Sequence, residues 1–378
     1  MIYADHAATT QLSQTAFEAA SEYLFEEYGN ASSRYSLGSR AKRAVELARE
    51  RVAEAIGAEP DEIFFTSGGS EGNAWALSCM REKTKSRLVV SSFEHPSVYE
   101  NALSIRKQGG RVDFIPVDNF GLISVDSCRD IFRGGRIGLV SVMLANNEVG
   151  TIQPIKTVVS MAKRYRTLVH TDAVQGVGRI PVDVNDLGVD LLTASAHKFN
   201  GPKGVGFLFK RRGVVLPALI RGGGQERGER SGTENVFGIV AASFALMESV
   251  AALKETDKKT RALTRRTIEV IGEELDKSDF QVIGDEQKRA PGVLNVLFRN
   301  ADSEAIAILL DMKGVCVSTG SACDSNKKTP SRVLLEMGFS PEEASSAIRV
   351  SYGRENTLEE AEIVGKTLCF AYKKLKRR

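Results

Sequence analysis

The sequence contains no long uncharged apolar stretch, and its first ten residues, MIYADHAATT, carry no basic segment before an apolar one. A membrane-spanning helix needs about 20 consecutive apolar residues, and a secretory signal needs a basic start followed by an apolar centre. We therefore expect neither a membrane protein nor a secreted one. A cytoplasmic location is the prediction that remains.

Cysteine is scarce, odd in number and widely spaced. The five thiols form no C-x-x-C pair, and the four histidines show no ligand spacing. A disulfide framework needs an even set of cysteines, and a closed zinc site needs paired ligands at short spacing. Neither is predicted, and the pattern is typical of a reducing cytoplasm. The cysteines are Cys79, Cys128, Cys316, Cys323 and Cys369.

A large excess of one charge is also missing. The chain has 51 basic and 48 acidic side chains, a net charge of +3, so binding to nucleic acid or to a membrane surface is not predicted. The one basic run, Lys373–Arg378, is typical of an exposed helix end, where cations face the negative end of the helix dipole. With 378 residues, 42% of them hydrophobic, the chain can bury one large and one smaller core.

Short apolar segments alternate with helical patterns over the first two thirds of the chain. This alternation predicts a mainly parallel sheet of seven strands covered by helices. Ligands bind such sheets beyond the carboxyl ends of the strands. The predicted strands lie in the segments EIFFTSG, RLVVSS, VDFIPV, IGLVSVM, TLVHTD, DLLTASA and VGFLFK.

The last third follows a different pattern. A long helical stretch runs from about Asn235 to Ser278 and is expected to break near Glu255–Asp257, and short strands are predicted in GVLNVLF, GVCVSTG and SSAIRVSYG. We therefore expect an α/β fold with a second, smaller α+β domain. The predicted large domain is 14–255, and the small domain combines 1–13 with 256–378.

Polar residues with a possible chemical role follow several of the predicted strands. In FTSGGSEGN, Gly68 and Gly69 permit a tight turn, and Ser70 falls where the N–H groups of a helix point outward, which suits phosphate. The segment lacks the G-x-x-x-x-G-K-[ST] pattern of nucleotide-binding loops. A glycine turn in which Ser70 only caps the helix is the alternative.

Four further side chains each have one functional and one structural interpretation. Lys198, in SAHKFNGPKG, is either a Schiff-base nucleophile or an exposed loop lysine. Asp172 either pairs with a cationic ring nitrogen or caps a helix. His95 either stacks on a planar ring and moves protons or enters a helix. Arg349, inside a predicted strand, clamps a carboxylate or forms a cross-strand ion pair.

Together, these groups match what pyridoxal 5′-phosphate chemistry requires: a phosphate cradle, a lysine, a carboxylate, a ring-stacking imidazole and a carboxylate clamp. The segment STGSACDS adds a cysteine, Cys323, in a small polar stretch that predicts an accessible loop. Cys316, between two valines, is predicted to be a buried strand thiol of little reactivity. Cys323 is either a functional nucleophile or an idle surface thiol.

Long motifs in a fixed order extend this pattern over nearly the whole chain. By them the sequence resembles the cysteine desulfurases of the NifS/IscS type, which belong to the class-V aminotransferase family of fold type I pyridoxal-phosphate enzymes. The active-cysteine loop, between Ser318 and Pro330, is similar to the longer version found in that group. The motifs are YADHAATT, GNASS, FTSGGSEGN, EHPSV, ANNEVGTIQP, HTDAVQGVG, SAHKFNGPKGVG, GGGQERGERSGTENV, STGSACDS and IRVSYGREN.

The resemblance implies roles for the residues around the cofactor ring. Lys198 would carry the cofactor and remove the Cα proton of the substrate. Asp172 would bind the pyridine nitrogen, and Gln175 would bind the ring hydroxyl oxygen. His95 would stack on the ring and take part in catalysis. Cys323 would be the nucleophile that takes up the substrate sulfur.

The phosphate contacts implied by the resemblance come from two subunits. Gly69, Ser70, Ser195 and His197 would hold the phosphate of their own subunit. Thr233 would reach the phosphate of the neighbouring subunit, which implies a homodimer.

The resemblance also implies the substrate and the reaction. Asn147 and Arg349 would hold the carboxylate of L-cysteine, with Asn30 as a further candidate. L-cysteine would become L-alanine, and the sulfur would remain on Cys323 as a persulfide. A sulfur-acceptor protein, either an iron–sulfur scaffold or a tRNA-thiolation protein, would receive it.

Two positions depart from the family pattern near the expected substrate entrance. His6 stands where the family has asparagine, and Arg34 with Tyr35 stands where the family more often has a small or histidine-like pair. Two other functions also remain open at this stage. An aminotransferase or selenocysteine lyase of the same fold would not require Cys323, and an idle sulfur-relay subunit would keep the fold without the cofactor.

Overall fold

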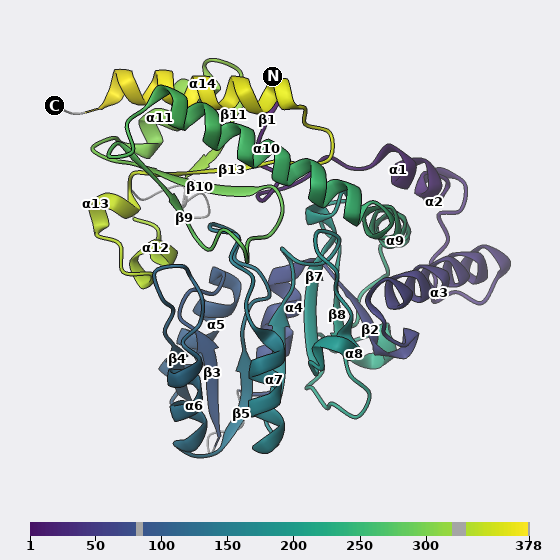
Figure 1. Cartoon of the computed structure of the whole chain (residues 1–378). Helices are drawn as coiled ribbons and strands as arrows, with labels where there is room; N and C mark the ends of the chain where they lie inside the picture. The colour runs from purple at the N-terminus through teal and green to yellow at the C-terminus, as the bar shows by residue number, and fades with distance from the viewer. Residues whose placement is uncertain (81–85, 320–329, 377–378) are drawn as a thin grey trace.

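The computed structural model describes residues 1–80, 86–319 and 330–376. This part of the chain forms a seven-stranded sheet, a four-stranded sheet and a short two-stranded pairing. Figure 1 shows the seven-stranded sheet in the lower part of the view, and the four-stranded sheet above it with the helices α10 (Leu253–Glu274) and α14 (Leu358–Leu375). The described chain is therefore an α/β structure with a second, smaller α+β unit.

All seven strands predicted for the large sheet are present in it, and the predicted fold class is confirmed. Neighbouring strands are parallel, except that β8 runs antiparallel to both β2 and β7. In spatial order the strands are β2 (Ile63–Thr66), β8 (Gly206–Lys210), β7 (Leu191–Ser195), β6 (Leu168–Asp172), β5 (Ile137–Ser141), β3 (Arg87–Ser91) and β4 (Arg111–Ile115).

Both faces of this sheet are buried, which explains why its strands read as nearly continuous apolar runs. In β3, for example, Leu88 and Val90 pack on one face with α4 and α5, whereas Val89 packs on the other with α3, α6, α7 and α9. The covering helices are α3 (Ser36–Ile56), α4 (Gly69–Ser78), α5 (Pro96–Lys107), α6 (Val125–Arg133), α7 (Ile155–Arg164) and α9 (Val236–Ala251), with the shorter α1 (Gln14–Ala20), α2 (Glu22–Phe25) and α8 (Val184–Leu187) at the periphery.

The smaller sheet is antiparallel throughout and packs against α10, α11 (Ser303–Asp311) and α14. The strand predicted in GVCVSTG is divided in two, and the structure adds two strands that the sequence pattern did not reveal, β9 and β1. In spatial order the sheet contains β12 (Ser318–Thr319), β13 (Ala347–Ser351), β10 (Val293–Phe298) and β9 (Phe280–Ile283); β1 (Ile2–Tyr3) pairs in parallel with β11 (Val315–Cys316), and α12 (Arg332–Glu336) and α13 (Pro341–Ala344) precede β13.

The long helical stretch of the last third breaks at Ala252, between α9 and α10, and the two helices meet at 71°. The break lies just before the predicted position at Glu255–Asp257, so α10 runs through that segment. The division of the chain at 255/256 therefore falls inside a helix and stays a prediction. No single helix in the described ranges is long and apolar enough to cross a membrane, although α9 and α10 pass that test as a bent pair.

Candidate active site

A cavity of about 720 Å³ lies at the carboxyl ends of the parallel strands, where a ligand site is expected in such a sheet. Its volume is within the range of about 300–1,000 Å³ typical of small-molecule sites. Ten of the residues predicted from the sequence line it. They are Gly69, Ser70, His95, Asn147, Asp172, Gln175, Ser195, His197, Lys198 and Arg349.

Lys198 ends the 3₁₀ turn η2 (Ala196–Lys198), which directly follows β7. Its ammonium group donates hydrogen bonds to the backbone carbonyls of Ala7 and Ala8, each at 2.6 Å. These carbonyls belong to the N-terminal segment that also lines the cavity. The amine is therefore held inside the cavity by neutral acceptors.

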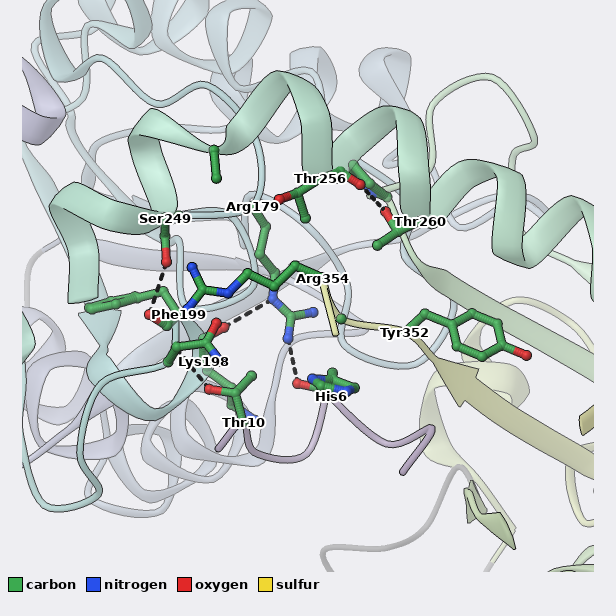
Figure 2. A pocket seen from close by; sticks show the side chains of 15 residues that line it. His6, Thr10, Arg179, Lys198, Phe199, Ser249, Thr256, Thr260, Tyr352 and Arg354 are labelled. Carbon is green, nitrogen blue, oxygen red and sulfur yellow. Dashed lines mark hydrogen bonds between the residues drawn. The ribbon is translucent and has the colours of Figure 1, made fainter. Parts of the chain in front are cut away.

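The guanidinium of the half-buried Arg179 supports the backbone on which Lys198 sits. Arg179 Nε donates to the carbonyl of Lys198 at 3.1 Å, and its Nη2 donates to the carbonyl of His6 (Figure 2). Burial lowers the pKa of Arg179 to about 10. Arg179, His6 and Lys198 line a second, much smaller cavity of about 40 Å³, and Lys198 also lines the main one. Arg179 thus ties η2 to the N-terminal segment.

Asp172 is the last residue of β6 and is almost completely buried, with 3% of its surface exposed. Two donors from the chain fix its carboxylate. Val174 N–H donates to Oδ1 at 3.0 Å, and the Asn73 side-chain amide donates to Oδ2 at 2.6 Å. A carboxylate held in this way can keep a bound ring nitrogen protonated.

His95 precedes α5 as its N-cap, and Pro96 occupies the first helical position. Its Nδ1 accepts a hydrogen bond from Ser97 N–H at 3.1 Å and lies 2.8 Å from Ser97 Oγ. Burial lowers the pKa of His95, while the neighbouring Asp172 acts in the opposite direction. The imidazole therefore favours the neutral form.

The predicted phosphate cradle lies at the start of α4, where the first N–H groups have no partner within the helix. Gly68 has φ +153°, and a Cβ on Gly69 would lie 2.7 Å from a methyl group of Val174. Glycine is thus required for this approach. Ser195 and His197 line the same cavity, and burial with nearby cations lowers the pKa of His197 to about 4.

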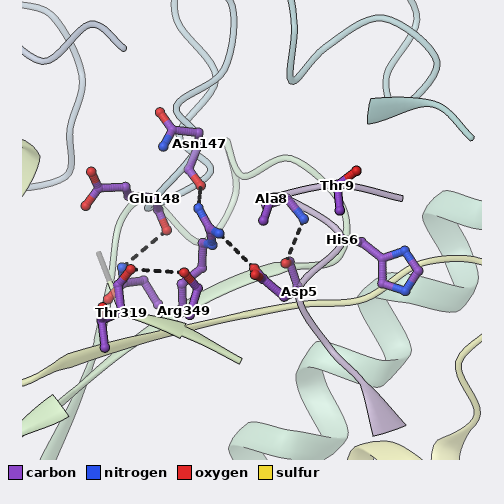
Figure 3. Close-up of polar contacts among 12 residues, drawn as sticks. Asp5, His6, Ala8, Thr9, Asn147, Glu148, Thr319 and Arg349 are labelled. Atoms are coloured by element: carbon purple, nitrogen blue, oxygen red, sulfur yellow. Dashed lines mark hydrogen bonds and ion pairs between the residues drawn. The ribbon is translucent and has the colours of Figure 1, made fainter. Parts of the chain in front are cut away.

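Arg349 lies on β13 and is 4% exposed. Figure 3 shows it between two partners: Nη2 pairs with Asp5 Oδ1 at 2.7 Å, and Nη1 donates to the backbone carbonyl of Asn147 at 2.8 Å. Its Nε is buried and has no partner in the part of the chain that the structure describes. These two contacts use two of the five N–H groups of the guanidinium, so Nε–H and further Nη–H groups remain for a bound carboxylate.

Because Asp5 is the counter-charge of a buried guanidinium, we expect Asp5→Ala to lower the free energy of unfolding by about 3 kcal/mol, as for other broken buried pairs. Chemical denaturation measures this. The matched control is Asp61→Ala, which breaks an exposed pair with Arg212 and should cost about 0–1 kcal/mol. Equal effects of the two substitutions would contradict the role assigned to Asp5.

Two buried glutamates line the cavity and were not found from the sequence. Burial raises the pKa of Glu94 to about 8 and that of Glu148 to about 7. Glu94 Oε1 accepts from Met143 N–H at 2.7 Å, and Glu148 Oε2 accepts from the Ser331 hydroxyl at 2.5 Å. Glu94 precedes His95, and Glu148 follows Asn147, both of which the motifs identify. An acidic residue in a motif gives no indication of whether it is buried.

Arg332 is a second residue that the sequence analysis missed. It begins α12 and lines the cavity. Its guanidinium donates to the backbone carbonyls of Ser92 and Glu94 and lies over the ring of Tyr99, 3.8 Å from the centroid. These contacts attach the start of α12 to the strand-end loop that carries His95.

Glu94 provides a test through pH. Its folded pKa of about 8 lies above the ordinary value of 4.5, so the stabilisation from its protonated form is complete below pH 4.5 and is lost as the pH rises through 8. We expect Glu94→Gln to remove a slope of up to about 1.4 kcal/mol per pH unit from the free energy of unfolding in this window. Denaturation at several pH values measures it, and an unchanged slope would contradict the buried acid.

Three predicted site residues do not line this cavity. Thr233 is exposed and lines a separate cavity of about 130 Å³. Asn30 is exposed, and its Oδ1 accepts from Ser32 N–H at 2.9 Å. Cys323 lies outside the described residues. Their predicted roles stay predictions.

The residues that depart from the family pattern also lie apart from the main cavity. His6 is buried, and its ring contacts Gly353 so closely that a Cβ there would lie 2.4 Å from it. Burial lowers the pKa of His6 to about 4. Tyr35 is 61% exposed. His6 is therefore a packing residue behind the cavity, not part of its lining.

The geometry defines a fold type I pyridoxal 5′-phosphate enzyme: a mainly parallel sheet whose strand ends present a lysine, a carboxylate and a helix N-terminus to one cavity. Comparison with known families agrees. The family described as aminotransferase class-V matches residues 2–364, and the chain belongs to this family. The family resemblance inferred from the motifs is confirmed.

Individual relatives are similar over nearly the whole chain. Cysteine desulfurase IscS of Methanosarcina thermophila is 41% identical over 367 residues, which are 96% of this chain and 90% of that protein. A solved NifS-like protein has a TM-score of 0.92 and 36% identity, covering 99% of this chain and 100% of its own. The structure of SspA in complex with cysteine has a TM-score of 0.82 and 30% identity, covering 94% and 100%.

The residues present fit pyridoxal 5′-phosphate. The cavity contains a buried acceptor, Gln175 Oε1, that has no partner among the described residues, while the Nε2 of the same side chain donates to the carbonyl of Ala7 at 2.9 Å. It also contains the amine of Lys198, the fixed carboxylate of Asp172 and the first N–H groups of α4. A ring with a hydroxyl group, an aldehyde, a cationic nitrogen and a phosphate matches these four features.

Proposed function

We propose that this chain is a cysteine desulfurase that converts L-cysteine to L-alanine and transfers the sulfur to its own thiol at Cys323. The observation that carries the proposal is the arrangement in one cavity of Lys198, Asp172 and Arg349. Relatives named cysteine desulfurase support the choice of substrate. The bound cofactor supplies an electron-accepting ring that stabilises negative charge at the Cα atom of an amino acid.

The side chains of the site then have separate tasks. Asp172 holds the ring nitrogen protonated, and Gln175 binds the ring hydroxyl. Arg349, oriented by Asp5, binds the substrate carboxylate through its remaining N–H groups. Lys198 Nζ takes the proton from Cα and returns a proton later, as a positioned general base and acid does.

The sulfur transfer balances without an external oxidant. The thiolate of Cys323 attacks the sulfur of the substrate, an S–S bond forms and the Cβ–S bond breaks. The electron pair of that bond remains on the carbon, which gains a proton and leaves as the methyl group of alanine. Cys323 keeps the sulfur as a persulfide, which an acceptor protein then takes.

The acceptor and the assembly are further parts of the proposal. We propose a cytoplasmic homodimer in which Thr233 reaches the phosphate bound by the partner subunit. The acceptor is an iron–sulfur scaffold or a tRNA-thiolation protein. Pro330 and Ser331 are the first described residues after the segment that contains Cys323, and both line the cavity. Their position supports delivery of the Cys323 thiol to the substrate.

The experiment that tests the function separates it from an aminotransferase of the same family. The purified holoenzyme is incubated with L-cysteine and a reductant, and alanine and sulfide are measured; a parallel reaction contains an amino acid and a keto acid. We expect equal amounts of alanine and sulfide and no keto-acid exchange. Exchange without sulfide would establish the aminotransferase instead.

A further inference from the structure

A hydrogen-bonded chain of four side chains, Asp172, Asn73, Ser97 and His95, runs along one wall of the cavity. We propose that Asn73 and Ser97 are positioning residues that keep Nδ1 of His95 unprotonated and its proton on Nε2. His95 then exchanges protons with a ligand through Nε2 alone. The inference deepens the proposed function and rests on it.

The first step fixes the orientation of Asn73. This residue lies on α4, is 1% exposed, and its Nδ2 is 2.6 Å from Asp172 Oδ2. An ionised carboxylate only accepts hydrogen bonds, so the nitrogen of the amide, and not its oxygen, must face Asp172. The hydrogen bond to Asp172 thus distinguishes the nitrogen of the Asn73 amide from its oxygen, which the atom positions alone do not.

The second step fixes the hydroxyl of Ser97. Asn73 Nδ2 also donates to Ser97 Oγ at 2.9 Å, which uses the second hydrogen of the amide. Because Ser97 Oγ accepts there, its own hydrogen is available for His95 Nδ1, 2.8 Å away. The carboxylate therefore sets the direction of the hydrogen bonds that Asn73 donates, and the Ser97 hydroxyl can donate onward to His95.

The third step assigns the tautomer of His95. Nδ1 also accepts from the backbone N–H of Ser97 at 3.1 Å. A nitrogen that faces two donors is unprotonated, so the neutral ring carries its proton on Nε2. No described residue bonds Nε2, and His95 lines the cavity. The Nε2–H group is thus the one that a ligand meets.

The charges around the ring agree with a neutral imidazole. Burial lowers the pKa of His95 most strongly, and the cations of Lys198 and Arg332 act in the same direction. Asp172 opposes them. Glu100 also lines the cavity, and Glu94 precedes His95 as a buried acid. Protonation of Nδ1 would in addition break the two hydrogen bonds that Nδ1 accepts from the hydroxyl and the backbone N–H of Ser97.

The test uses nitrogen-15 NMR of the holoenzyme labelled at histidine, since the chain has four histidines in all. We expect His95 to show a protonated Nε2 and an unprotonated Nδ1. In Ser97→Ala and Asn73→Ala, we expect its pKa to rise by about half a unit to one unit. The first substitution removes a donor to Nδ1, and the second removes the donor to Ser97 Oγ, which can then accept from a protonated Nδ1. Ser97→Thr keeps a hydroxyl and should restore the wild-type value.

The matched control is Ser104→Ala, an exposed serine on the same helix, which should leave the His95 resonances unchanged. A protonated Nδ1 in the wild type would overturn the proposal. So would a wild-type pKa in Ser97→Ala, which does not depend on whether Asn73→Ala folds. The holoenzyme could also show the Nε2–H resonance of His95 and yet release no alanine from cysteine. That result would refute the proposed function but not the hydrogen-bonded chain from Asp172 to His95.

Discussion

Lys198→Ala is expected to remove the visible absorbance of the bound cofactor and to lower alanine release by about 10³-fold or more, as for loss of a positioned acid–base group. The physical reason is that alanine has no amine to carry the cofactor or to take the Cα proton. The absorbance spectrum of the purified protein and an alanine assay measure the two effects.

Lys203→Ala is the matched control, because Lys203 is an exposed lysine of the same connection between β7 and β8. It should retain the colour and the activity. A Lys198→Ala protein with the wild-type spectrum would remove Lys198 from the account, whatever its activity.

Cys323→Ser is expected to abolish alanine release from cysteine while the cofactor spectrum remains unchanged. A hydroxyl group at this position is a far weaker nucleophile toward sulfur than a thiolate, but it does not disturb the groups that hold the cofactor. The measurement is alanine release together with the absorbance spectrum.

The control for this substitution is Cys316→Ser. Cys316 lies on β11 and is half-buried, not buried as the sequence predicted. Partial burial and nearby carboxylates raise its pKa, which disfavours the reactive thiolate. The variant should retain most of the activity. Normal turnover by Cys323→Ser would instead favour the aminotransferase or selenocysteine lyase alternative, neither of which requires this thiol.

Much of the large sheet is predictable because its strands are short, apolar and separated by helical patterns. β3 and β6 are examples: each is a run of buried residues followed by polar ones. The small sheet is harder to predict. β9 is only partly buried, and the two-residue pairing of β1 with β11 joins segments from the two ends of the sequence, so local pattern carries little information about either.

The candidate site also has one part that the sequence predicts and another that it does not. Asp172 ends β6, whereas Lys198 and His95 lie a few residues after the ends of β7 and β3. The topology of a parallel sheet brings such positions together. The residues that orient them come from elsewhere. Asn73 meets Asp172 across 99 positions and Asp5 meets Arg349 across 344, and only the folded chain reveals such contacts.

The role of a buried carboxylic acid was equally hidden. Glu94 and Glu148 occur in motifs as ordinary acidic residues, and their raised pKa values result from burial. Three-dimensional packing, and not the local sequence, decides whether such a residue is buried. The helix break was predicted near Glu255–Asp257, but its position at Ala252 was not, because no proline or glycine marks the change of direction.

The central claim is that sulfur from free cysteine passes to one thiol of this chain. The most direct measurement is mass spectrometry of peptides from the holoenzyme after brief incubation with L-cysteine, without reductant and with a reagent that traps persulfides. The account predicts one additional sulfur atom on the peptide that contains Cys323 and none on those containing Cys79, Cys128, Cys316 or Cys369. Alanine formed while that peptide gains no sulfur would contradict it.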